Sequence, residues 1–136
     1  MSCSRPKTRL DEAGGLTVAD VIHRRFTALA ASATIGEIRE WFAASTSRRM
    51  ALLAAADGCY AGSLTPEHVA GDLDPDLPAS VLAQHWPTVP PDAPAATAEH
   101  LALLTPARRV PVVDGDGRLL GVVSVTSDLK SFCGTD

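Results

Sequence analysis

The stretch RRVPVVDGDGRLLGVVSVTSDL, residues 108–129, decides the fold. It holds two short apolar runs, 110–113 and 119–123, separated by two Asp-Gly steps at 114–117. Asp-Gly between two runs rich in Val and Leu is typical of a β-hairpin. The hydroxyl residues that follow are good helix N-caps: Ser124, Thr126 and Ser127. We therefore expect a strand, a turn, a second strand and a capped final helix.

A weaker copy of this unit lies earlier in the chain. Residues 48–53 match 108–113 at an offset of 60 (108 − 48), and residues 62–65 match 121–124 at an offset of 59 (121 − 62). The apolar residues from Ile35 to Phe42 recur at the intervals of one face of a helix, and residues 95–102 show apolar residues at the same intervals. A period recurring in several segments indicates an internal repeat. Each copy is expected to run helix, strand, helix, strand, strand, helix.

The repeat divides the chain into three segments. Residues 1–15 show no apolar periodicity and are expected to be a flexible N-terminal arm. Residues 16–75 form the first repeat and residues 76–134 the second. The predicted fold class is mixed α/β (α+β). We expect two half-domains around a shared core of Ala, Leu and Val. Within it we expect equivalent helices at 34–44 and 94–104, a strand at 27–29, and a helix from Pro78 to about His85.

Composition indicates a globular chain with few other features. Hydrophobic residues make up 46% of the 136 residues and charged residues 21%. The net charge of −4 disfavours a nucleic-acid partner. No apolar run reaches the roughly 20 residues of a membrane span, and the N-terminus lacks the apolar segment of a signal peptide. Three widely spaced cysteines form no disulfide framework, so we expect a cytoplasmic protein. The Ala, Arg, Gly and Pro bias suggests a bacterial source.

These features resemble a tandem pair of CBS domains, the regulatory module named for cystathionine β-synthase. The resemblance is carried by the repeat length, the strand order and the run V-P-V-V-D-x-D-G-R-L-x-G-V-V-S at 110–124, and it covers about residues 17–132. It implies two half-domains of β-α-β-β-α type related by a pseudo-twofold, and a homodimer. It also implies clefts between the repeats that bind AMP, ADP, ATP or S-adenosylmethionine as regulatory ligands.

The ribose motif of this family is altered in both repeats. The family pattern is Gly, two apolar residues, Ser or Thr, two variable residues and an Asp that accepts hydrogen bonds from both ribose hydroxyls. The first repeat has His68 where this Asp is expected. The second has Asp128 one residue late. If Ser124 is the N-cap of the final helix, Ser127 takes the position of the ribose-binding Asp. If Thr126 is the N-cap, Asp128 lies near the start of the helix and complements its dipole. A bulge near Val125 would return Asp128 to the ribose-binding position.

The resemblance suggests which residues would hold a nucleotide. We favour the cleft of the second repeat for ribose, the segment 88–89 for adenine and one of the Arg pair 108–109 for phosphates. The candidate ligand-binding residues are Ser124, Ser127, Asp128, Thr88, Val89, Arg108 and Arg109, with Thr65 and His68 in the first repeat. The alternatives are that Thr65 and Ser124 are plain N-caps and that the arginines, like the equivalent pair 48–49, are solvated.

Two function classes remain open. One is a sensor of an adenosine-containing ligand that changes the behaviour of an unidentified partner protein. The other is a degenerate scaffold that acts by dimerisation or partner binding without a nucleotide. The sequence holds no Gly-x-Ser-x-Gly, phosphate loop or coupled Cys/His pair, so we expect no enzyme and no required cofactor. The four histidines do not pair at metal-ligand spacing, so no metal site is expected.

Overall fold

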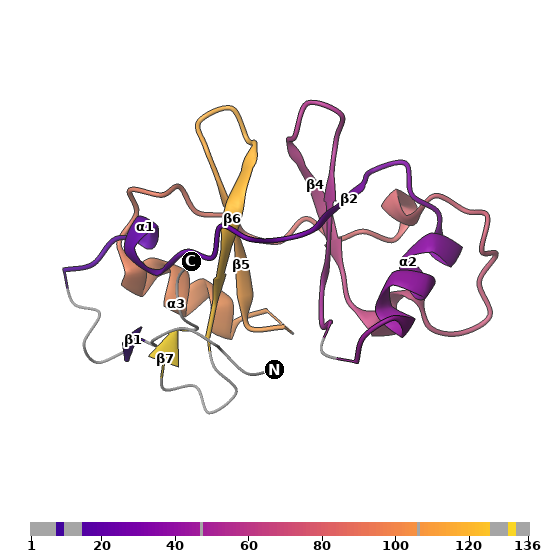
Figure 1. Cartoon of the computed structure of the whole chain (residues 1–136), viewed down its shortest axis with the longest axis horizontal. Helices are drawn as coiled ribbons and strands as arrows, with labels where there is room; N and C mark the ends of the chain where they lie inside the picture. Colours follow the sequence, from indigo (N-terminus) through magenta and orange to yellow (C-terminus); the bar gives the residue numbers. More distant parts are fainter. Residues whose placement is uncertain (1–7, 10–14, 47, 106, 126–130, 133–136) are drawn as a thin grey trace. The chain divides into compact units, whose positions relative to one another are not determined.

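The chain folds into two compact units. The computed structural model describes residues 8–9, 15–46, 48–105, 107–125 and 131–132. Contacts between residues divide the chain into unit 1, made of Met1–Phe26 and Trp86–Asp136, and unit 2, made of Thr27–His85 (Figure 1). These limits differ from the sequence period of 16–75 and 76–134. Each unit therefore contains most of one repeat together with the opening segment of the other.

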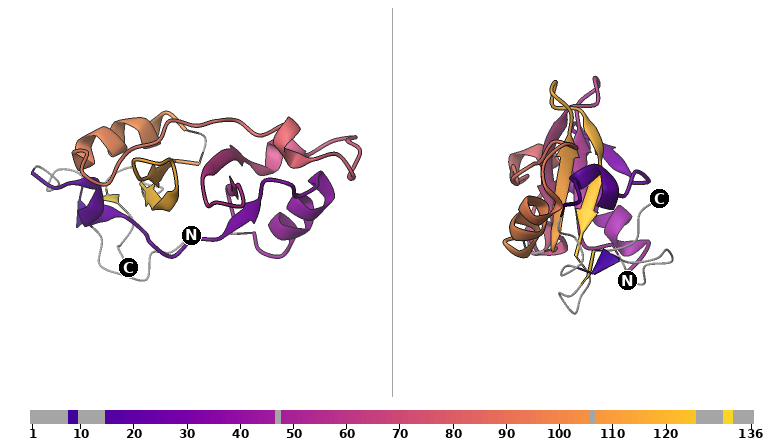
Figure 2. Two further views of the ribbon diagram at one scale, coloured as in Figure 1. Left: turned by 90° about the horizontal axis from the view of Figure 1, so that it is seen from above. Right: turned by 90° about the vertical axis from the view of Figure 1, so that its left-hand side faces the viewer.

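Unit 2 is a three-stranded sheet with one α-helix. Its strands are β2 (Ala28–Ala30), β3 (Ala51–Ala54) and β4 (Tyr60–Leu64), in the order β2-β3-β4. Strand β2 runs parallel to β3, and β3 and β4 form an antiparallel hairpin. Helix α2 (Ile35–Ala43) lies beside these strands (Figure 2). It buries Ile35 and Ile38 in the apolar cluster of this unit. Two short 3₁₀ helices complete the unit: η2 (Pro66–Val69) and η3 (Ala79–Val81).

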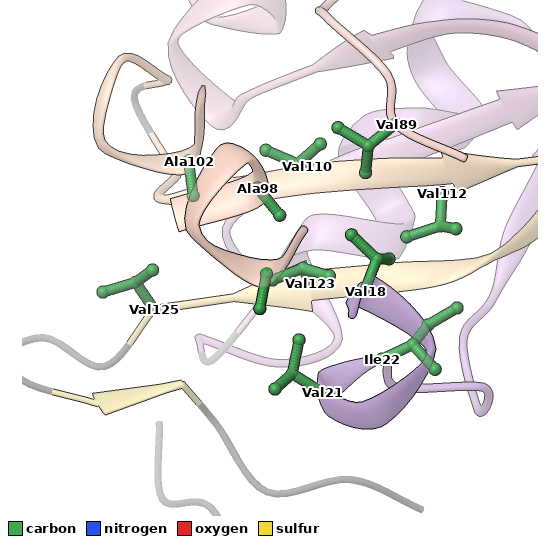
Figure 3. Close-up of a cluster of buried hydrophobic side chains, with 11 residues drawn as sticks. Val18, Val21, Ile22, Val89, Ala98, Ala102, Val110, Val112, Val123 and Val125 are labelled. Atoms are coloured by element: carbon green, nitrogen blue, oxygen red, sulfur yellow. The ribbon is translucent and has the colours of Figure 1, made fainter. Parts of the chain in front are cut away.

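Unit 1 repeats this plan around a second hairpin. Strands β5 (Arg109–Val113) and β6 (Leu119–Ser124) pair antiparallel, and Val89 bridges to Val112 in parallel, at the place that β2 takes in unit 2. Helices α1 (Val18–Val21) and α3 (Ala95–Leu103) lie against the hairpin. Figure 3 shows their apolar side chains converging on those of β5 and β6: Val18, Val21, Ala98, Ala102, Val110, Val112 and Val123.

Matching backbone hydrogen bonds place the helices α2 and α3. The amide of Ile35 at the start of α2 donates to Leu77 O, and the amide of Ala95 at the start of α3 donates to Leu16 O, both at 2.9 Å. Two further bonds correspond in the same way, both at 2.8 Å: Ala79 N to Ala33 O and Val18 N to Ala93 O. The predicted equivalence of the helices at 34–44 and 94–104 is therefore confirmed.

The opening segments of the repeats also join the hairpins. His23 and Val122 exchange two backbone hydrogen bonds of 2.8 and 2.9 Å, and Gln84 and Ser63 exchange two of 2.9 and 2.7 Å. The predicted helix from Pro78 to about His85 is consequently wrong in length. Only η3 is helical, because Gln84 must be extended to pair with the sheet.

The other fold predictions have definite outcomes. Hairpins are present at 50–64 and 109–123, and a strand is present close to 27–29. The expected single shared core is replaced by two clusters, one in each unit, to which both repeats contribute. Within the arm expected at 1–15, β1 (Thr8–Arg9) pairs with β7 (Ser131–Phe132). The predicted final helix after Ser124 lies outside the described residues.

We expect Gly121→Ala to destabilise the protein. A Cβ at Gly121 would lie 2.2 Å from the His23 carbonyl oxygen and 2.8 Å from the Ile22 side chain, so the paired segment must move. Overpacking of this kind costs about 1–3 kcal/mol in the free energy of unfolding, measurable by urea denaturation. Gly115→Ala is the control, because a Cβ there meets nothing within 4 Å. Equal stabilities of the two variants would contradict this account of the pairing.

Candidate functional site

The ribose motif of the first repeat forms a tight cap at the end of β4. Thr65 is the N-cap of η2, and its backbone amide donates a hydrogen bond of 3.0 Å to Nδ1 of His68. The amide of His68 donates back to Thr65 O at 3.0 Å. The structure thus brings together Thr65 and His68, the two candidate residues of this repeat, and gives His68 a partner within the chain.

An exposed carboxylate sits in the same turn. A hydrogen bond from the Thr65 side chain lowers the pKa of the Glu67 carboxyl below its ordinary value, and the Glu67 backbone amide and nearby His68 act in the same direction.

Arg39 holds the far end of this turn and was not predicted from the sequence. From helix α2, its Nε donates to Val69 O at 2.6 Å and its Nη2 donates to Gly71 O at 2.8 Å. A guanidinium suits this task because its donors form a rigid fork. The equivalent position in the second repeat is Glu99, which has no donor to offer a carbonyl. Comparing the two repeats position by position could have drawn attention to Arg39.

In the second repeat, the candidate arginines lie across the hairpin from Ser124. Arg109 is the register partner of Ser124, and the amide of Val125 donates to Arg108 O at 3.0 Å. Ser124 is buried, and Val125 belongs to the core of unit 1. Ser127 and Asp128 lie outside the described residues.

Equivalent arginines of the two repeats have different partners. In the first repeat, the guanidinium carbon of Arg48 lies 4.5 Å from the centre of the Trp41 ring, and its Nη1 donates to Trp41 O. In the second, Arg108 adopts a left-handed backbone with φ of 54°, which is costly for a residue with a Cβ. Its Nε is buried and finds no hydrogen-bond partner among the described residues. Arg48 is thus engaged internally, whereas Arg108 retains a donor.

The segment predicted to meet adenine is part of the sheet of unit 1. The Val89 amide donates to Pro111 O at 3.2 Å, and Val89 O accepts from Val113 N at 3.0 Å. The Val89 side chain is buried in the core, and Thr88 is half-buried. The backbone N–H and C=O groups of successive strand residues point to opposite sides of the strand. Because those of Val89 face β5, those of Thr88 face away from it.

Unit 2 also has an open groove of about 470 Å³ between β2 and α2. Trp41 and Arg48 line it, together with Glu37 and Glu40. Among the residues that the structure describes, no predicted site residue lines this groove. The groove is therefore separate from the altered ribose motif at Thr65 and His68.

The described part of the chain offers neither a metal cluster nor a membrane span. No group of three or more His, Cys, Asp or Glu residues there could hold a metal ion. No helix among the same residues is both long and apolar enough to cross a membrane.

Comparison with known proteins identifies the fold. Residues 77–127 match the CBS domain family model. The CBS domain protein PAE2072 from Pyrobaculum aerophilum, complexed with AMP, is 28% identical with a TM-score of 0.68, over 80% of this chain and 87% of that one. CBSX2 from Arabidopsis thaliana, a CBS-pair protein, is 20% identical with a TM-score of 0.70, over 81% and 89%.

A third similar structure is the cystathionine β-synthase pair domain of the putative Mg²⁺ transporter SO5017 from Shewanella oneidensis. It is 15% identical to this chain, with a TM-score of 0.70. The similarity covers 79% of this chain and 64% of that chain. No curated protein sequence matched. This protein therefore carries a CBS domain and has the fold of a CBS-domain pair.

We expect Thr65→Ala to raise the pKa of Glu67 towards its ordinary value, because the strongest cause of the lowering is the Thr65 hydrogen bond. A carbon-detected NMR titration of the Glu67 carboxyl measures this. Since the folded pKa is lowered, Glu67 contributes stability above its ordinary pKa that is lost as the pH falls through the folded pKa. Thr65→Ser keeps the hydroxyl and should preserve the lowered pKa. An unchanged pKa in Thr65→Ala would show that the hydroxyl is not the cause.

Proposed function

We propose that this protein is a regulatory CBS-pair module that binds an adenosine-containing ligand: AMP, ADP, ATP or S-adenosylmethionine. The observation that carries this proposal is Arg108, a half-buried arginine in a costly backbone conformation beside the end of β6, whose Nε is buried without a hydrogen-bond partner among the described residues. A strained residue with an unpaired buried donor is typical of a functional position. A guanidinium there suits an anionic phosphate. Two of the similar structures are complexes with AMP, PAE2072 and CBSX2.

In this proposal the second repeat supplies the nucleotide contacts. Ser124, Ser127 and Asp128 would hold the ribose, and Thr88 offers outward backbone groups to the adenine edge. Arg108 and Arg109 lie together at the start of β5, across from Ser124, where they would meet phosphate. Arg109 also donates from Nη1 to Ala107 O at 3.4 Å, which leaves Arg108 as the stronger candidate.

A second candidate function is a scaffold that binds no nucleotide. It is favoured by His68, which replaces a carboxylate and already accepts a hydrogen bond from Thr65. In that case the module would act through self-association or through contact with a regulated partner.

Thermal unfolding with AMP, ADP, ATP and S-adenosylmethionine separates the two functions. A ligand present at 100 times its dissociation constant should stabilise the folded protein by about 2.7 kcal/mol, which a shift in melting temperature reveals. No shift with any of the four at millimolar concentration would favour the scaffold.

We expect Arg108→Ala to weaken nucleotide binding by about tenfold or more, because a hydrogen bond to a charged group contributes about 1.5–3 kcal/mol. Calorimetric titration with the nucleotide that gives the largest shift measures the loss. Arg118→Ala is the matched control, since Arg118 is an exposed arginine on the turn between β5 and β6. Equal affinities for Arg108→Ala and Arg118→Ala would remove Arg108 from the site.

We also propose that the protein is a homodimer. Helix α3 is rich in alanine, which allows close approach of helices, and Leu103 and Leu104 at its end are 43% and 68% exposed. Large exposed side chains of this kind are candidates for burial between copies. Multi-angle light scattering at micromolar concentration should give twice the chain mass of 14.2 kDa. A monomer mass at that concentration would contradict the proposal.

A further inference from the structure

Strand β2 has an open outer edge. It is the end strand in the order β2-β3-β4, and no bridge among the described residues joins its other side. The amide of Ala31 donates to Ala54 O at 2.9 Å and therefore faces β3. By alternation, the backbone groups of Ala28 and Ala30 face outward, and both residues are exposed. The edge thus presents both amides and the Ala28 carbonyl, whereas Ala30 O already accepts from Ala33 N at 2.9 Å.

The second repeat does not have this open edge. At the repeat offset of 60 (90 − 30), Ala30 corresponds to Pro90. Proline has no amide hydrogen, and it is one of the residues with which proteins prevent pairing at the edge of a sheet. Val89 nevertheless pairs in parallel with Val112, so the strand itself is kept. The open edge is therefore a property of the first repeat and not of the fold.

The groove between β2 and α2 lies beside this edge. Its volume is about 470 Å³, and its apolar lining includes Leu29, Ile38 and Trp41. A second open hollow of about 560 Å³ adjoins it along residues 28–32 and 54–56. A chain paired with β2 would point its side chains alternately to the two faces of the sheet, so every second one would lie over the groove.

The charges of the groove favour a basic group at one end. Glu37, in the first turn of α2, and Glu40, almost one turn later, both line the groove and are exposed. Glu37 caps Thr34 through Oε1 alone, so Oε2 keeps unused lone pairs. The remaining charged residue of the lining, Arg48, follows α2 and is already stacked on Trp41, to whose carbonyl its Nη1 donates.

We propose that the outer edge of β2 and this groove bind an extended segment of a partner protein, in which a basic residue is followed two positions later by a large apolar residue. The edge supplies backbone hydrogen bonds, as in other complexes formed by strand addition. Glu37 and Glu40 receive the basic side chain, and Trp41 contacts the apolar one. The inference does not depend on nucleotide binding, because it uses no residue of the proposed nucleotide site.

The spacing and direction of the segment follow from the groove. Residues two apart on a strand share a face at about 6.6 Å, and the four residues from Glu37 to Trp41 rise about 6 Å along the helix. Because β3 runs parallel to β2, the connecting helix α2 returns antiparallel to β2, with Glu37 beside the end of β2. A segment antiparallel to β2, the slightly more stable pairing, therefore carries its basic residue first.

Two acetylated pentapeptides test the proposal on the whole ¹⁵N-labelled chain: Thr-Lys-Thr-Leu-Thr and the same peptide with Glu in place of Lys. Titration with the lysine peptide at millimolar concentration should shift the amides of Ala28 and Ala30 and the indole N–H of Trp41. Replacing Lys by Glu should weaken binding by about fivefold, because an exposed ion pair is lost and a like charge is added. No shift in β2 with the lysine peptide, or equal affinities for the two peptides, would overturn the proposal.

Variants of the edge and of the groove separate the two kinds of contact. Ala30→Pro copies Pro90 and removes an outward amide, so it should abolish the shifts, whereas Ala30→Ser keeps the amide and should bind as the wild type does. Glu40→Gln lies on an exposed helix position, leaves the edge unchanged and should weaken the lysine peptide by about two- to fivefold. Binding by a folded Ala30→Pro with wild-type affinity, or by Glu40→Gln with wild-type affinity, would overturn the proposal.

Hydrogen exchange tests the strand pairing directly. The Ala30 amide should exchange about tenfold more slowly when nine-tenths of the protein is bound, because only the free tenth exchanges. An unchanged rate would show that the peptide does not pair with β2. If the β2 amides instead shift when the protein alone is diluted, a second copy occupies the edge, and the proposal of a partner segment is overturned.

Discussion

The fold depends on two pairs of backbone hydrogen bonds that tie opening segments to hairpins, His23 with Val122 and Gln84 with Ser63. Each pair lies beside a glycine, because the crossing segment comes too close for a side chain. A Cβ on Gly121 would meet the His23 carbonyl oxygen, and a Cβ on Gly62 would lie 2.9 Å from the Ala83 side chain. Gly62 also has a φ of +137°, which disfavours other residues. These contacts let the opening segment of each repeat complete the core of the other unit, so neither repeat has a complete core by itself.

The pseudo-symmetry applies to the backbone much more closely than to the side chains. Arg48 and Arg108 have the same place in the two repeats, and their amides donate to Ser45 O and Thr105 O at 3.3 and 3.2 Å. Arg48 is nevertheless stacked on Trp41, whereas Arg108 keeps a buried Nε without a described partner. The side-chain contacts of these two arginines therefore differ, although the backbones around them correspond.

The sequence predicted local elements better than long-range pairing. The hairpins were predictable because Asp-Gly turns between apolar runs are a local signal, and glycines with positive φ do occupy both turns, at Gly58 and Gly117. The helix from Pro78 was predicted too long because its end is set by a sheet partner, Ser63, that lies well before it in the chain. The limits of the two units likewise differ from the repeat period, because that period does not report which hairpin an opening segment joins. At the site, the sequence predicted the loss of a carboxylate at His68, but only the geometry revealed that Thr65 takes its one acceptor.

Position 68 separates what folding needs from what binding needs. Capping requires one acceptor facing the amide of Thr65, and such a cap contributes about 1 kcal/mol. Both aspartate and histidine meet that requirement. Holding a ribose requires further acceptors at the same residue, and hydrogen bonds to a charged carboxylate contribute about 1.5–3 kcal/mol to binding. An exchange of Asp for His can therefore leave the turn of η2 intact and remove the ribose contact. The intact turn at Thr65, held at its far end by Arg39, is then no evidence that the first repeat binds a nucleotide, because the same geometry serves a purely structural cap.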